Sequence, residues 1–391
     1  VKANENISLT VEHIKDDTEM GAWANFNDFT TLPCLVSVSA LGPYAGTPGE
    51  GCMDIDANSD ENNSSMNTPN LASATNDFIG LTMNWTVGDW QLTSITGHVE
   101  RQESFDLEYD ASSVEFLNIT GSSDYEQLSQ EFRINGNLSE AVTLTAGVYY
   151  WDSEFRQDQT SHDMWGYLGF TPDTHQTLDN TGSNTATSLF ASADIQLSDA
   201  LVLNLGGRYT EEEKTFRAAN VGFYSDSLGV LVPDGPYQDF SQKWREFSPR
   251  AALQYTVNDD MMLFSSFSKG FKSGGYFARS TVVDGDGYDP ETVETFELGL
   301  KSEWMDNRVR MNVTAFMTDY NNKQEEIIIF AGDPPSANTV VRNASSVEMK
   351  GLELELTAVV SSELNMYFNA GLLDSNYSEF IADINGDGVD T

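Results

Sequence analysis

Apolar and polar residues alternate along most of the chain, in stretches of about 10 to 15 residues. Leu201–Thr210 places Leu, Leu, Leu, Gly and Tyr on one side of an extended chain, and Val, Asn, Gly, Arg and Thr on the other. The same two-residue period occurs in Leu189–Leu197, Val309–Met317 and Gly351–Ala358. A helix would scatter these apolar residues around its circumference, whereas a strand gathers them on one face. The pattern therefore predicts an all-β chain.

The alternating stretches predict about 13 strands. They lie near residues 7–13, 76–86, 90–105, 123–136, 141–155, 183–197, 201–215, 243–257, 261–272, 292–304, 308–322, 345–359 and 364–378. Strands of soluble proteins are most often about 5–6 residues long, and most of the predicted strands are about twice that length. The lengths favour a transmembrane antiparallel β-barrel. A soluble all-β protein, such as a propeller or a tandem sandwich, is the alternative.

The connections between the predicted strands alternate between short and long. Short polar turns fall near residues 87–89, 137–140, 198–199, 258–260, 305–307 and 361–363. Long polar loops fall near residues 14–75, 106–122, 156–182, 216–242, 273–291, 323–344 and 379–391. Outer-membrane barrels have this asymmetry, with tight turns on the periplasmic side and long loops outside the cell. Compact soluble domains rarely contain so many long loops.

The strand count also bears on completeness. Bacterial barrels of this kind close with an even number of strands, and an unpaired strand edge is costly in lipid. We therefore expect the chain to be the middle of a larger barrel, with the closing strands outside residues 1–391. The sequence contains no run of about 20 apolar residues, so it predicts no transmembrane helix.

Charge narrows the classes of partner. The chain has 61 acidic and 20 basic residues, for a net charge of −41. Such a surface repels phosphates, which argues against nucleic-acid binding. The same acidity, placed mostly on external loops, should disfavour highly anionic ligands and favour neutral or cationic ones.

Enzyme signatures are absent from the sequence. It contains no G-x-S-x-G, H-E-x-x-H, P-loop or C-x-x-C pattern. Neighbouring carboxylates such as those in 211–213 are expected by chance in so acidic a chain. We therefore predict that the protein is not an enzyme.

Two stretches carry a family resemblance. Residues 263–276 read LFSSFSKGFKSGGY and residues 288–302 read YDPETVETFELGLKS. They resemble the barrel of TonB-dependent outer-membrane receptors, in which an S-K-G-F-K-S-G-G phrase precedes a P-E-x-V-x-x-x-E-x-G-x-K strand. The matching positions are Ser268, Lys269, Gly270, Phe271, Lys272, Ser273, Gly274 and Gly275, followed by Pro290, Glu291, Val293, Glu297, Gly299 and Lys301.

The resemblance implies a 22-stranded barrel in the outer membrane of a Gram-negative bacterium, around a plug that this chain lacks. It implies TonB-dependent uptake of a scarce ligand such as a siderophore complex, a vitamin or an oligosaccharide. The implied partners are the TonB complex, which would engage a missing N-terminal region, and the lipid and lipopolysaccharide of the outer membrane. A passive porin-like channel or a structural, adhesive barrel is the alternative function.

Two cysteines, Cys34 and Cys52, lie in the first long loop. In an exported protein they suggest a disulfide, which would be worth about 3 kcal/mol by the chain-entropy estimate. Two free thiols are the alternative. The predicted role of the disulfide is structural.

Near the end of the sequence, Asp383, Asn385 and Asp387 match the first half of a calcium-binding loop. Asp284, Asp286 and Asp289 form a looser acidic cluster. Because outer loops are generally rich in Asp, Asn and Gly, we favour a plain polar loop in both places. Ca²⁺ in external loops is the only cofactor that the sequence suggests.

Three histidines lie in or beside predicted loops. His162 and His175 share one loop, and His13 lies at the start of another. Loop histidines can bind haem or a metal. However, haem-uptake members of the resembled family tend to carry Phe-Arg-Ala-Pro where residues 271–274 read Phe-Lys-Ser-Gly. We therefore interpret the histidines as bystanders.

The alternation also predicts which charged residues face the barrel lumen. These are Arg208, Arg250, Lys301, Arg310, Glu353 and Glu355. By resemblance they would contact the plug or line the ligand path. The alternative is that they are the paired charges of any water-facing wall, and the pattern does not single out a ligand residue.

Overall fold

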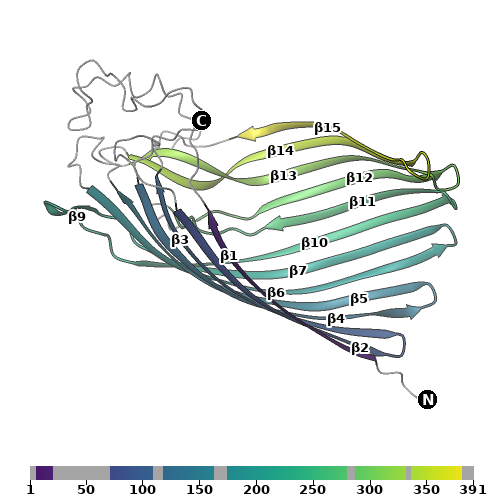
Figure 1. Ribbon diagram of the computed structural model, residues 1–391, viewed down its shortest axis with the longest axis horizontal. Coiled ribbons are helices and arrows are strands. Elements are labelled where there is room, and N and C mark those ends of the chain that lie inside the picture. Colours follow the sequence, from purple (N-terminus) through teal and green to yellow (C-terminus); the bar gives the residue numbers. More distant parts are fainter. Residues whose placement is uncertain are drawn as a thin grey trace.

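The computed structural model describes residues 6–20, 71–108, 118–162, 174–279, 287–331 and 336–380. They form one antiparallel sheet of 15 strands (Figure 1). The strands are β1 (Asn6–Met20), β2 (Leu71–Val87), β3 (Trp90–Glu108), β4 (Asn118–Ser139), β5 (Val142–His162), β6 (Thr174–Ser198), β7 (Leu201–Ala218), β8 (Phe223–Ser225), β9 (Gly229–Val232), β10 (Gln238–Asn258), β11 (Met261–Lys272), β12 (Glu291–Trp304), β13 (Val309–Ala331), β14 (Ser336–Val359) and β15 (Asn365–Phe380).

The order of the strands in the sheet follows the order in the sequence. Thirteen strands form the main path, β1 to β7 followed by β10 to β15, and each pairs with the next. The short strands β8 and β9 lie off this path, where β8 pairs with β6 and β9 pairs with β8. The predicted all-β class and the 13 long strands are therefore confirmed. The two additional short strands lie within the predicted loop 216–242.

Several strands are longer than the alternation indicated. β6 begins at Thr174 rather than near residue 183, and β14 begins at Ser336 rather than near residue 345. Parts of the predicted loops 106–122, 156–182 and 323–344 are consequently strand. Residues 174–182 (THQTLDNTG) are mostly polar on both faces. Hydrogen bonds between strands continue here although neither face is apolar, so hydrophobic periodicity cannot detect the extension.

Tight turns join the long strands at one end of the sheet, on the right in Figure 1. Apart from the start of β1 at Asn6, the strand ends beside the undescribed stretches lie at the opposite end. The turn between β12 and β13 contains three consecutive non-glycine residues with positive φ: Met305 (58°), Asp306 (54°) and Asn307 (63°). The short turns therefore gather at one end of the sheet as predicted, and the long external loops stay a prediction.

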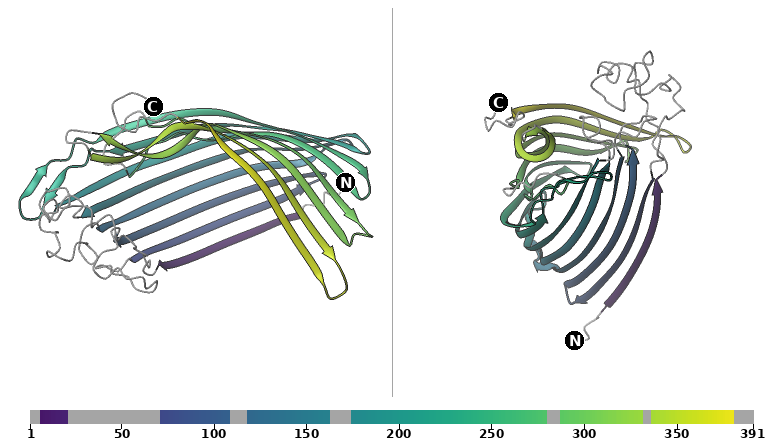
Figure 2. Two further views of the ribbon diagram at one scale, coloured as in Figure 1. Left: turned by 90° about the horizontal axis from the view of Figure 1, so that it is seen from above. Right: turned by 90° about the vertical axis from the view of Figure 1, so that its left-hand side faces the viewer.

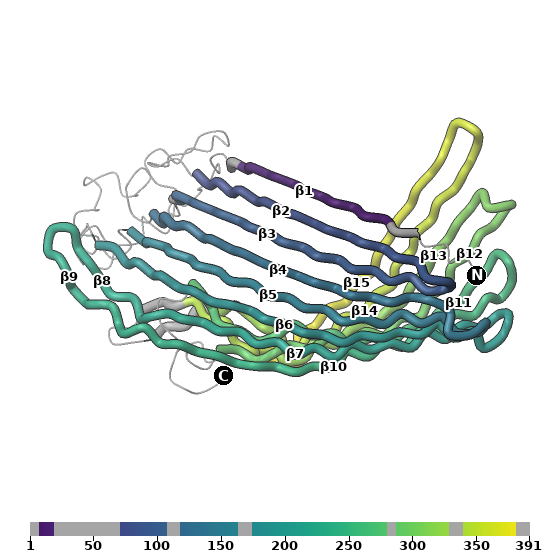
Figure 3. The backbone as a smooth tube through the Cα atoms, turned by 90° about the horizontal axis from the view of Figure 1, so that it is seen from below, coloured from purple at the N-terminus to yellow at the C-terminus, as the bar shows by residue number. Residues whose placement is uncertain are grey.

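The sheet is strongly curved rather than flat (Figure 2). The tube in Figure 3 shows β1 to β7 following one another across the sheet, with β12 to β15 turned away from them. β1 and β15 are the outermost strands, and they do not pair with each other in the part of the chain that the structure describes. Within the described residues, no helix has the length and apolar character needed to cross a membrane.

Few large apolar side chains are buried. Among the described residues, the buried hydrophobic ones are Leu178, Phe216, Ala218, Ala252, Val340, Ala344 and Val347. Many leucines, phenylalanines and tyrosines of the long strands are instead exposed. A soluble protein would bury these side chains, so the position of the exposed apolar residues on the sheet becomes the main question.

Candidate functional site

One face of the sheet is apolar near the turn end. Tyr209 on β7 lies opposite Leu189 on β6 and Phe247 on β10, and these two neighbours are 59% and 57% exposed. A groove on this face is lined mainly by apolar side chains, among them Met83, Trp85, Leu92, Phe132, Ile134, Val148 and Leu189. We call this surface the apolar face. A contiguous exposed apolar surface of this kind is typical of a wall that contacts lipid.

The other face of the same strands, which we call the polar face, carries charged and hydroxyl groups. Arg208 on β7 donates hydrogen bonds to Ser188 Oγ (2.9 Å) and to Thr210 Oγ1 (3.3 Å). Its guanidinium also lies 5.1 Å from the ring centroid of Tyr149. Arg208 is therefore fixed against the wall by neighbouring strands.

All six residues that were predicted to face the lumen lie on the polar face: Arg208, Arg250, Lys301, Arg310, Glu353 and Glu355. Besides Arg208, two of them have polar partners on the wall itself. Arg310 forms a 2.7 Å ion pair with Glu303, and Glu355 accepts a 3.1 Å hydrogen bond from Asn312. A role for any of the six in ligand binding stays a prediction.

The sequence motif continues past the end of β11. Ser268–Lys272 are the last five residues of that strand. Gly275, beyond the strand, exchanges two backbone hydrogen bonds of 2.9 Å with Tyr288. We name residues 273–279 and 287–290 the inward segment. The other motif positions lie just before β12 or within it: Pro290, Glu291, Val293, Glu297, Gly299 and Lys301.

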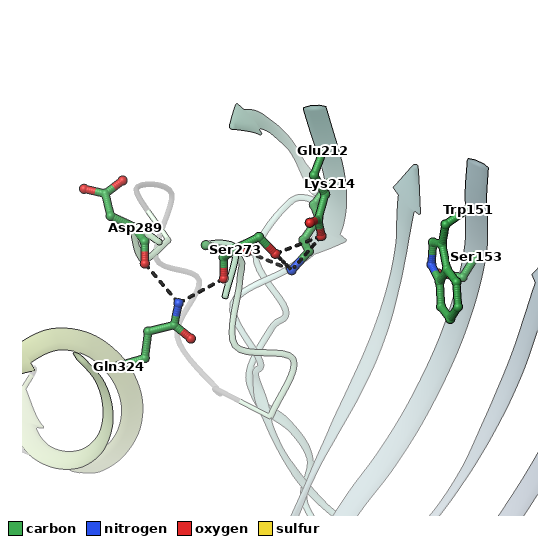
Figure 4. A network of polar contacts seen from close by, with 8 residues as sticks. Trp151, Ser153, Glu212, Lys214, Ser273, Asp289 and Gln324 are labelled. Atoms are coloured by element: carbon green, nitrogen blue, oxygen red, sulfur yellow. Dashed lines mark hydrogen bonds and ion pairs between the residues drawn. The ribbon is translucent and has the colours of Figure 1, made fainter. Parts of the chain in front are cut away.

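The inward segment is anchored to β7 by Lys214 and Glu212. Lys214 Nζ donates to Ser273 Oγ (2.7 Å) and to the carbonyl oxygen of Gly274 (2.8 Å). Ser273 Oγ in turn donates to Glu212 Oε1 at 2.8 Å. Figure 4 shows Lys214, Glu212 and Ser273 meeting at this point. The two strand residues and the segment thus form one closed polar cluster.

The anchor is shielded from water. The side chains of Lys214 and Glu212 are 25% and 14% exposed and lie 3.4 Å apart. Burial lowers the pKa of Lys214 from its ordinary value, and the carboxylate of Glu212 opposes that effect. Because a buried ammonium is costly without a partner, the pair is stable only while both groups are present.

A second anchor joins the inward segment to β13 and β14, which lie beyond β11 and β12 from the first anchor on β7. Gln324 on β13 donates to the carbonyl oxygens of Ser273 (2.9 Å) and Asp289 (3.0 Å), as Figure 4 shows. Asn343 on β14 donates to the same Asp289 carbonyl at 2.8 Å, and its own side-chain oxygen accepts the Asp289 N–H at 2.7 Å. Asp289 therefore acts here through its backbone.

Between the two anchors the inward segment packs against the sheet. The ring of Tyr276 stacks on Phe216 of β7, with centroids 5.4 Å apart, and tilts against Phe240 of β10. Asn180 of β6, which is 2% exposed, donates to the carbonyl oxygen of Ala278 at 2.5 Å. One short segment thus contacts strands from β6 to β14. Such strands converge only on the concave side of a curved sheet, so the polar face is the concave face.

Beyond the apolar face, four carboxylates lie in register across adjacent strands: Asp77 on β2, Glu100 on β3, Glu126 on β4 and Glu154 on β5. We name them the acidic row. Like charges directly opposite each other destabilise a sheet. His98, Glu100 and Glu126 also place one ligand atom each within 4.8 Å of one another. Exposed acidic groups gather in this way without a metal, so we assign no site to them.

A charge cluster lies immediately above the apolar face on β7 and β10. Glu211 lies 2.7 Å from Lys243 Nζ and 2.6 Å from Arg245 Nε. Hydrogen bonds from Lys243 and then from Arg245 lower the pKa of Glu211 below its ordinary value. This arrangement was not anticipated, because residues 211–213 look like an ordinary acidic run until the register with β10 is known.

The histidines are strand residues rather than loop residues. His13 on β1 lies 3.5 Å from Asp77. His162 ends β5, His175 is the second residue of β6, and the two lie directly opposite each other. The prediction that both belong to a loop at 156–182 was wrong, because β5 and β6 extend into that range.

Some predicted sites fall outside the described residues. These are Cys34, Cys52, Asp284, Asp286, Asp383, Asn385 and Asp387. The disulfide and the calcium sites therefore stay predictions.

Comparison with known proteins gives a consistent result. The family described as "TonB dependent receptor-like, beta-barrel" matches residues 17–391. The metal-pseudopaline receptor CntO of Pseudomonas aeruginosa is 25% identical over 186 residues, which cover 46% of this chain and 25% of CntO. The ferric-pyoverdine 358 receptor of Pseudomonas putida is 24% identical over 189 residues, which cover 47% of this chain and 21% of that receptor.

Among solved structures, the ferric yersiniabactin uptake receptor FyuA from Yersinia pestis superimposes with a TM-score of 0.65 at 15% identity. The match covers 80% of this chain and 44% of FyuA. At this identity the likeness concerns the fold alone. In both kinds of comparison, the matched region is less than half of the other protein.

Proposed function

The chain belongs to the TonB-dependent receptor β-barrel family, and on that premise we propose that it forms part of the wall of a receptor for energy-coupled uptake of a scarce ligand. Members of this family are β-barrels of the bacterial outer membrane. The observation that carries the proposal is the family match over residues 17–391. The family consists of receptors and transporters, so we propose no enzymatic activity.

The two faces of the sheet support this function. The apolar face suits contact with the hydrocarbon of the outer membrane. The acidic row and the charge cluster of β7 and β10, which lie beyond that face, would lie among the lipid and lipopolysaccharide headgroups. The concave polar face would surround the plug and the ligand path. The inward segment takes up part of the concave space between β6 and β14, which suits a gated receptor better than an open pore.

For the ligand, we propose a metal–siderophore complex. The two relatives compared above are named for metal-pseudopaline and ferric-pyoverdine. The net charge of −41 favours ligands that are neutral or cationic over strongly anionic ones. A vitamin or an oligosaccharide is the alternative within the same transport class. The TonB complex would act through a part of the protein outside this chain.

Equilibrium binding to the purified full-length protein tests the ligand class. The probes are a panel of neutral, cationic and anionic ferric siderophores, together with cobalamin and a linear maltooligosaccharide, each titrated calorimetrically in detergent. We expect saturable binding of at least one neutral or cationic ferric siderophore and none of cobalamin or the oligosaccharide. Saturable binding of cobalamin or the oligosaccharide alone would assign the receptor to another ligand class.

A further inference from the structure

His162 and His175 form a cross-strand pair at the far end of the sheet from the turns. They are directly opposite in the register of β5 and β6, which runs without a shift from Val142–Ile195 to this point. Their ring centroids are 6.1 Å apart, with the ring planes inclined by 38°. We propose that these two imidazoles bind one transition-metal ion.

The spacing of the rings suits a shared ion. Metal–nitrogen bonds to histidine are about 2.1 Å long, so two rings that bind one ion place their centroids about 5 to 6.5 Å apart. The observed 6.1 Å lies inside this range. The side chains of opposite residues in an antiparallel pair leave the backbone on the same face. Strand pairing therefore brings the two rings together without any loop rearrangement.

Neighbouring side chains leave one nitrogen of each ring available. Nε2 of His162 lies 3.3 Å from Thr120 Oγ1, and Nδ1 of His175 lies 3.7 Å from Asp226 Oδ1. Among the described residues, Nδ1 of His162 and Nε2 of His175 have no hydrogen-bond partner. In metal-binding histidines the nitrogen that does not bind the ion typically hydrogen-bonds to an oxygen, which fixes the tautomer and the ring orientation. Thr120 provides such an oxygen for His162, whereas the 3.7 Å contact of His175 with Asp226 is an ion-pair distance and not a hydrogen bond.

The ring of His175 is also restrained on its other side. Tyr224 of β8 pairs with His175 in the sheet, and their rings stack with centroids 5.7 Å apart and planes inclined by 21°. The His175 side chain is 27% exposed, so an ion can reach it from solvent. A ring held between two neighbours loses little freedom when it binds a ligand, which favours affinity.

The ligand type indicates which metals the pair would take. Imidazole suits Cu²⁺, Ni²⁺ and Zn²⁺, whereas Ca²⁺ and Mg²⁺ prefer oxygen ligands. Among divalent ions, Cu²⁺ binds nitrogen sites most tightly. Two protein nitrogens leave coordination positions for water or for a chelator. The site does not depend on the proposed uptake, because it requires only these two residues and the ion.

Copper binding to the purified full-length protein tests the site. The protein is stripped with EDTA, dialysed into chelator-free buffer and titrated with Cu²⁺, with calorimetry and electron paramagnetic resonance as readouts. The variants are His162→Gln and His175→Gln. His98→Gln is the matched control, because His98 lies on β3 beside two carboxylates and away from the pair. Thr120→Val removes the oxygen beside His162 and leaves both ligands in place.

We expect one Cu²⁺ equivalent whose spectrum shows nitrogen coupling from two imidazoles. Either histidine variant should remove that spectrum, His98→Gln should keep it, and Thr120→Val should lower the affinity about tenfold. Far-ultraviolet circular dichroism confirms that each variant keeps its strand content. Equal copper binding by the parent protein and both histidine variants overturns the proposal, as does loss of the spectrum with His98→Gln alone.

Discussion

Lys214 on β7 donates a 2.7 Å hydrogen bond to Ser273, a residue 59 positions further along the chain. Ser273 lies just beyond β11, which is separated from β7 in the sheet by β10. This contact fixes the inward segment to the concave face. It also links Lys214, which belongs to no sequence motif, to the S-K-G-F-K-S-G-G motif at residues 268–275.

Replacing Lys214 with Met should loosen the inward segment. The change leaves the largely buried carboxylate of Glu212 without its cation, which we expect to cost about 1–3 kcal/mol of unfolding free energy. Hydrogen exchange of the amides in residues 273–279 should accelerate. Lys243→Met is the control, because Lys243 is 42% exposed in its pair with Glu211 and exposed ion pairs contribute little to stability. Equal exchange of this segment in the two variants would show that Lys214 does not anchor it.

Gly274 tests the packing of the same segment without changing any charge. A Cβ at this position would lie 2.6 Å from Cζ2 of Trp244, and it would also collide with the backbone of Tyr288. Gly274→Ala should therefore lower the free energy of unfolding by about 1–3 kcal/mol. Gly371→Ala is the matched control, since a Cβ there meets nothing within 4 Å. Chemical denaturation in detergent compares the two, and similar losses would refute the close packing at Gly274.

Glu211 predicts a pH dependence of stability. Its folded-state pKa is lowered by Lys243 and Arg245, so its contribution is present above the ordinary carboxyl pKa of about 4.3 and is lost as the pH falls through the folded value. Glu211→Gln should therefore lower the melting temperature at pH 7. The difference from the parent protein should shrink as the pH falls from about 6 to 3. A difference that stays constant over this range would contradict the assignment.

The acidic row predicts a stabilising substitution. Glu126 lies directly between Glu100 and Glu154, so Glu126→Gln relieves repulsion on both sides. We expect a gain of about 0.2–1 kcal/mol at low salt and a smaller one at high salt. Glu363→Gln removes the same formal charge at an exposed turn and serves as control. Thermal melts at low and high ionic strength compare the stability of the two variants with that of the parent protein. A loss of stability in Glu126→Gln at low salt would mean that the row is held by contacts other than those described.

The sequence predicted the strands well where one face is apolar. Leu201–Thr210 sorts its side chains between lipid and water, and the structure has β7 there. The alternation pattern does not extend to residues 174–182, where most side chains on both faces of β6 are polar although the strand pairing continues. The same extension explains why His162 and His175 looked like loop residues: their pairing depends on register, which composition does not encode.

The inward segment shows a similar limit. Its motif could be recognised, because Ser273, Gly274 and Gly275 form part of a distinctive phrase. Its partners could not, because Lys214, Gln324 and Asn343 are single polar residues on three separate strands. Only the curvature of the sheet brings them within reach of one segment.

The most direct test of the account is whether uptake through this receptor requires TonB. The full-length gene is expressed in a Gram-negative host that lacks its own siderophore receptors, in tonB-positive and tonB-negative versions, and accumulation of the bound ferric siderophore is measured. We predict accumulation that depends on both the receptor and TonB. Receptor-dependent accumulation that is equal in the two hosts would contradict the account and identify the protein as a passive channel.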